Sequence, residues 1–70
     1  MTPAADITRD LEAMIDRHGL LHVITALECI CFEKEMHIIT NWQDARTAKP
    51  WGVAARKLTA LGRQVEPLNI

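Results

Sequence analysis

The sequence predicts an all-α fold, a bundle of two or three helices with a long central helix. This prediction rests on three observations. Among 70 residues there are only three glycines and three prolines, so few positions interrupt a helix. Two tryptophans, one phenylalanine and no tyrosine fall short of the aromatic content typical of a sheet protein. Large apolar residues recur at steps of three and four, which is the spacing of one helix face.

The first helix is expected over about residues 3–18. Thr2 can cap its first turn, with Pro3 at the first helical position, where the missing N–H costs nothing. Gly19 suits a left-handed residue at the end of the helix, and a Schellman ending would bring the following leucine against Ile15. The apolar stripe of this helix is formed by Ile7, Leu11, Met14, Ile15 and His18.

The second helix, about residues 20–42, is expected to be apolar on more than one side. Its main face comprises Leu20, Ile24, Leu27, Cys31, Ile38 and Trp42. A second group, the shoulder, comprises Leu21, Phe32, Met36 and Ile39. At 1.5 Å per residue this helix spans roughly 35 Å and the first only about 24 Å, so apolar surface is left for another element. The shoulder is therefore the expected interface of a homo-oligomer; a three-helix monomer that buries both faces is the alternative.

The third helix is expected over about residues 48–64, with Thr47 or Lys49 near its cap. Pro50 is tolerated only in a first turn, and Pro67 ends the segment. A kinked helix that begins at Asn41 is the alternative, because Asn41 and Asp44 resemble a start signal. The apolar stripe of this helix comprises Ala48, Trp51, Ala55, Leu58 and Val65.

Charge is divided unevenly along the chain. Residues 1–41 hold seven acids and three bases (−7 + 3 = −4), whereas residues 42–65 hold five bases and one acid (+5 − 1 = +4). The five cations of the third helix form a basic face that could follow a phosphate backbone or meet an acidic partner. These residues are Arg46, Lys49, Arg56, Lys57 and Arg63. Nucleic-acid binding is nevertheless the less favoured interpretation, since the chain is net negative (−1) and its first two helices are acidic.

The sequence contains no pattern that indicates catalysis, a cofactor or a metal centre. Glu33 and His37 are one helical turn apart, with His22 and Cys29 on the same side, but one straight helix cannot wrap a metal ion. Cys29 and Cys31 point in opposite directions on a helix, so both should be free thiols. Free thiols, together with the lack of a membrane-spanning apolar run and of a signal-peptide pattern, favour the cytoplasm.

One stretch resembles a group of short, uncharacterised helical proteins of bacteria and their mobile elements. The resemblance covers about residues 14–61 and is carried by three runs and a downstream Trp51. These runs are Asp16-Arg17-His18-Gly19-Leu20, then Cys31-Phe32-Glu33-Lys34 with His37-Ile38, and Asn41-Trp42-Gln43-Asp44. The resemblance implies a helical fold and a bacterial setting, and no activity.

The sequence thus favours a non-catalytic protein–protein interaction module that forms a homo-oligomer, without cofactor or membrane association. A small nucleic-acid-binding regulator, using the basic face of the third helix, is the alternative. Salt dependence separates the two, because phosphate binding weakens steeply with salt and apolar association does not.

Overall fold

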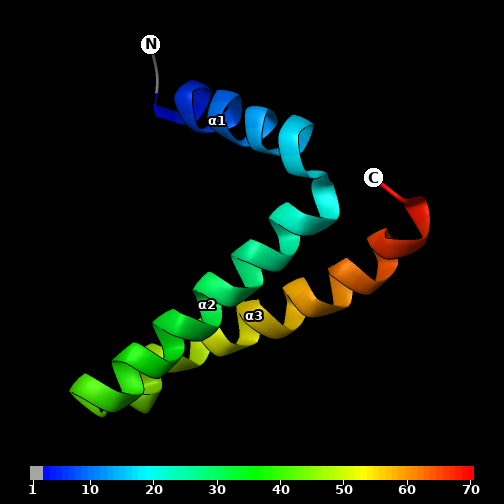
Figure 1. Cartoon of the computed structure of the whole chain (residues 1–70). Helices are drawn as coiled ribbons and strands as arrows, with labels where there is room; N and C mark the ends of the chain where they lie inside the picture. The colour runs from blue at the N-terminus through cyan, green and yellow to red at the C-terminus, as the bar shows by residue number, and fades with distance from the viewer. Residues whose placement is uncertain (1–2) are drawn as a thin grey trace.

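The computed structural model describes residues 3–70 and confirms the all-α class. Three α-helices follow one another, α1 (Pro3–His18), α2 (Leu20–Trp42) and α3 (Ala45–Val65), and a 3₁₀ turn, η1 (Glu66–Leu68), completes the chain (Figure 1). The first two helices occupy the ranges that the sequence predicts. Thr2, the predicted cap of α1, lies outside the described residues.

Gly19 separates α1 from α2 in a conformation that only glycine adopts readily. Its φ of 90° and ψ of 154° lie outside the left-handed helical region, so the predicted left-handed ending is wrong in ψ although its positive φ is confirmed. The Gly19 N–H donates to the Ile15 carbonyl at 2.7 Å, a single bond in place of the Schellman pair. The extended ψ turns the chain sharply, which sets the angle between α1 and α2.

The start of α3 corrects the prediction that this helix begins at Ala48. Asp44 is the N-cap: its carboxylate accepts hydrogen bonds from Thr47 N (3.2 Å) and Thr47 Oγ1 (2.6 Å). These bonds lower the pKa of Asp44, the side-chain bond most strongly. The helix therefore begins at Ala45, and Pro50 is its sixth residue, where proline removes the N–H that would bond the Arg46 carbonyl. The segment around Pro50 is helix, not loop.

Helices α2 and α3 pack as an antiparallel pair across a seam of small residues. On α3 the seam residues are spaced by four and three, and they are Ala48, Gly52, Ala55, Thr59 and Gly62. At Gly62 a Cβ would lie 3.7 Å from Leu21 Cδ1 and 3.8 Å from Ile24 Cγ2. At Gly52 a Cβ would clash with the Glu35 carboxyl group, whose carbon would be 2.7 Å away. Small residues let the two helices approach closely along their length.

Helix α1 does not join this pair to make a closed three-helix bundle. It contacts α2 near their shared turn and then diverges, so that α1 and α2 form the arms of an open V (Figure 1). The molecule is correspondingly flat, with extents of 38 × 35 × 14 Å. The expected bundle is thus present only as the α2–α3 pair, because α1 diverges from that pair and does not pack along it.

The end of the chain returns to the α1–α2 turn. Asn69 has a left-handed backbone (φ 57°), which reverses the chain after η1. This reversal brings the main-chain oxygen of Ile70 to 3.1 Å from Leu21 N. The contact satisfies one of the N–H groups that the first turn of α2 leaves without a helical acceptor.

Candidate interaction surface

The small-residue seam buries little of the large apolar side chains. The buried apolar residues are Val23, Ile24, Ile38, Ala48, Ala55 and Val65. By contrast, Trp42 is 68% exposed, and several other large apolar side chains of α1 and α2 are also exposed. Despite this apolar character, none of the described helices is long and apolar enough to cross a membrane.

Part of this exposed apolar surface, including Met14, Leu27 and Ile30, lines a groove between α1 and α2. The groove has a volume of about 340 Å³, and its lining residues are Leu11, Met14, His18, His22, Val23, Ala26, Leu27 and Ile30. Met14 on one wall is 47% exposed, and Ile30 on the other is 48% exposed. The groove was not predicted, because the sequence pattern placed Leu27 on the main apolar face of the second helix. The signal that could have found it is the spacing of Val23, Leu27 and Ile30, which places these residues together on one side of α2.

The predicted shoulder of α2 is divided by the structure. Leu21 is half-buried at the seam beside Gly62, so it belongs with the packed pair. Phe32, Met36 and Ile39 are exposed on α2. They lie on the flank of α2 opposite the groove, because α2 turns by about 100° per residue. Two exposed apolar surfaces therefore flank the seam.

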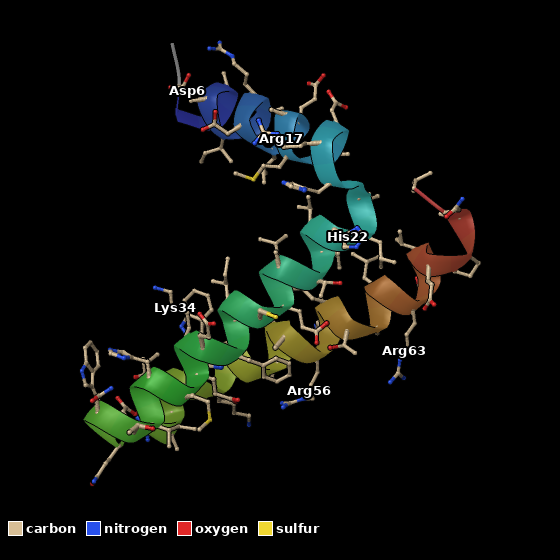
Figure 2. The ribbon with its side chains drawn as sticks, viewed as in Figure 1. Asp6, Arg17, His22, Lys34, Arg56 and Arg63 are labelled. Atoms are coloured by element: carbon tan, nitrogen blue, oxygen red, sulfur yellow. The ribbon has the colours of Figure 1, made fainter. Side chains whose placement is uncertain are left out.

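The five residues of the predicted basic face are all exposed on α3. Lys49, Arg56 and Arg63 recur every seven residues and so share one side of the helix. Figure 2 shows Arg56 and Arg63 projecting away from α1, whereas Lys34 of α2 projects from the side that faces α1. The Lys34 ammonium lies 5.9 Å from the centroid of a Trp51 ring, a contact within cation–π range. The basic face and the groove thus occupy opposite sides of the α2–α3 pair.

The polar side chains considered as metal ligands are engaged locally or stand apart. His22 Nδ1 lies 2.8 Å from the His18 carbonyl oxygen, and the Asn41 amide lies 3.0 Å from His37 Nδ1. Among residues 3–70 no group of three or more His, Cys, Asp or Glu side chains could hold a metal ion. Cys29 and Cys31 are free thiols, as their helical spacing predicts. Of these residues, only His22 lines the groove.

Comparison with known proteins adds no family to this description. No protein-family model, curated protein or solved structure matches the chain.

Proposed function

We propose that this chain is a non-catalytic protein–protein interaction module that associates with itself. The observation that supports the proposal is the pattern of exposure: large apolar side chains on both flanks of α2 face solvent, while α3 closes the seam with small residues. Leaving a large apolar side chain exposed forgoes roughly 1.5–3 kcal/mol of burial. A second copy of the chain would bury these exposed side chains and so add to the core, which is marginal in a 70-residue chain.

The chemistry of the surface supports a non-catalytic role. The groove is lined by apolar side chains, with His18 and His22 as its polar members. A general base or nucleophile needs a partner within hydrogen-bonding reach, and His22 instead contacts a main-chain carbonyl. The two free thiols suit a reducing compartment such as the cytoplasm, and the resemblance to small bacterial and mobile-element proteins suggests the setting.

Multi-angle light scattering over a dilution series tests self-association. We expect the mass at high micromolar concentration to be a multiple of the 7.9 kDa chain and to fall on dilution. The same series in high salt should leave the oligomer intact, because apolar burial is not screened. A monomer at every concentration would refute the proposal.

A nucleic-acid-binding regulator is the second candidate, favoured by the exposure of all five basic side chains on α3. Fluorescence anisotropy with a short labelled duplex at low and moderate salt tests it. Binding that weakens steeply with salt, and that Arg56→Glu with Arg63→Glu abolishes, would establish this function. Binding that is absent at low salt would remove it.

A further inference from the structure

We infer that the groove between α1 and α2 binds α1 of a second copy of this chain, so that two copies exchange their first helices about a twofold axis. The inference rests on the self-association proposed above and assigns a surface and an occupant to it. Three features of the structure support it: the lining of the groove, the unused part of the α1 stripe, and the charges at the two ends of α1.

The lining of the groove suits the apolar face of a helix. One wall carries Leu11 and Met14 of α1, and the other carries Val23, Leu27 and Ile30 of α2. No carboxylate lines it, and its polar residues are two histidines at the closed end. The apolar face of an amphipathic helix therefore meets no carboxylate among the lining residues of the groove.

Helix α1 itself has that character. Of its 16 residues, four are acidic and two are arginine, and its apolar residues share one face. Ile7 extends this face beyond the lining of the groove and is 57% exposed. Two copies of α1 packed antiparallel would place each Ile7 toward the α2 wall of the other copy. The arrangement is isologous, so one set of contacts is made twice.

The charges on α1 favour this antiparallel alignment. Its first turn carries Asp6, and its last turn carries Arg17 and His18. In an antiparallel pair Asp6 of one copy lies opposite Arg17 of the other, and the helix dipoles also oppose each other. Figure 2 shows Asp6 toward the free end of α1 and Arg17 nearer the turn. Docking on the opposite flank would instead bring the basic face of α3, including Arg56, near its own copy.

Two matched double variants test the assignment by light scattering and sedimentation. Ile7→Glu with Met14→Glu places carboxylates on the apolar face of α1 that would contact the second copy, and we expect the dimer dissociation constant to rise at least about a hundredfold. Met36→Glu with Ile39→Glu changes residues of similar exposure on the other flank, and we expect a change of less than about tenfold. Circular dichroism of both variants checks that the helices form.

The outcomes separate this inference from the proposed function. An unmodified chain that is monomeric would refute both. An oligomer that the Met36 and Ile39 substitutions disrupt, and the Ile7 and Met14 substitutions do not, would overturn the helix exchange and leave self-association standing.

Disulfide trapping supplies a second measurement that does not depend on the glutamate variants folding. The background carries Cys29→Ser and Cys31→Ser, which removes both native thiols. With Asp6 opposite Arg17 the twofold axis passes near Leu11, so Leu11→Cys should form a cross-linked dimer on mild oxidation. Thr40→Cys, exposed at the far end of α2, is the matched control. Cross-linking of Leu11→Cys no greater than that of Thr40→Cys would overturn the inference.

Discussion

Helices α3 and α1 differ in how closely they pack on α2. Both α1 and α3 are amphipathic helices next to α2, yet α3 packs along α2 and α1 leaves it after the turn. Ala55, at the centre of α3, is fully buried, whereas Ile7 and Met14 of α1 are about half exposed. The difference shows that an apolar stripe alone does not close a helix pair. Small residues opposite large ones allow α3 to approach α2 closely along the seam, whereas α1 contacts α2 only near the turn.

Ala55→Leu should destabilise the α2–α3 pair more than any other single substitution considered below. Three added carbons at a fully buried seam position force the helices apart, at a cost of about 3 kcal/mol. Ala13→Leu on α1 is the control, because Ala13 is exposed and its change should be within about 0.5 kcal/mol. Urea unfolding at one protein concentration measures both. Equal losses for the two variants would contradict the seam.

Pro50→Ala should strengthen α3. The substitution restores an N–H for the Arg46 carbonyl and removes an interior proline, which is about 3 kcal/mol less favourable than alanine in a helix. The lost stiffness of the unfolded chain offsets part of this, so we expect a net gain of about 1–2 kcal/mol in the free energy of unfolding. Thermal melting followed by circular dichroism would show it. A lower melting temperature would mean that the proline fits its position without loss.

Gly62→Ala should increase the free energy of unfolding by a smaller amount. Its Cβ would make ordinary contacts with Leu21 and Ile24, so no neighbour has to move. Alanine is favoured over glycine in a helix by about 1 kcal/mol, and we expect a stabilisation of about 0.5–1 kcal/mol in urea unfolding. Gly62→Leu is the contrasting variant: it should destabilise, because a larger side chain exceeds that space. Stabilisation by both would show that the seam is open there.

Asp44→Ala should give the smallest effect, a lower melting temperature, while Asp44→Asn keeps a capping oxygen and should change it less. The folded-state pKa of Asp44 is lowered by its bonds to Thr47, so its contribution is present above the pKa of the unfolded chain. That contribution is lost as the pH falls through the lowered value. The melting temperatures of the native chain and Asp44→Ala should therefore converge in acid. A constant difference down to low pH would contradict the cap.

Local signals in the sequence predicted the helices well and their partners poorly. Pro3 and Gly19 mark the ends of α1, and the structure has the helix there. The predicted start of α3 was wrong. It relied on Pro50, which is expected in a first turn, whereas the cap bonds from Thr47 to Asp44 favour the earlier start. Leu21 was assigned to the exposed shoulder, and it is half-buried beside Gly62. A helical wheel cannot tell which of two apolar flanks a neighbour covers.

The helical class, the first two helices and the two opposing charge groups follow directly from the amino-acid sequence, because capping, periodicity and composition act over a few residues. The packing of α3 on α2 through its small residues, and the divergence of α1 that leaves a groove, became evident only from the three-dimensional arrangement of the helices. The physical reason is that packing depends on matched shapes across residues distant in the chain, such as Glu35 against Gly52. The exposed faces of α1 and α2 follow from that match, and with them the surface on which a second copy is proposed to bind.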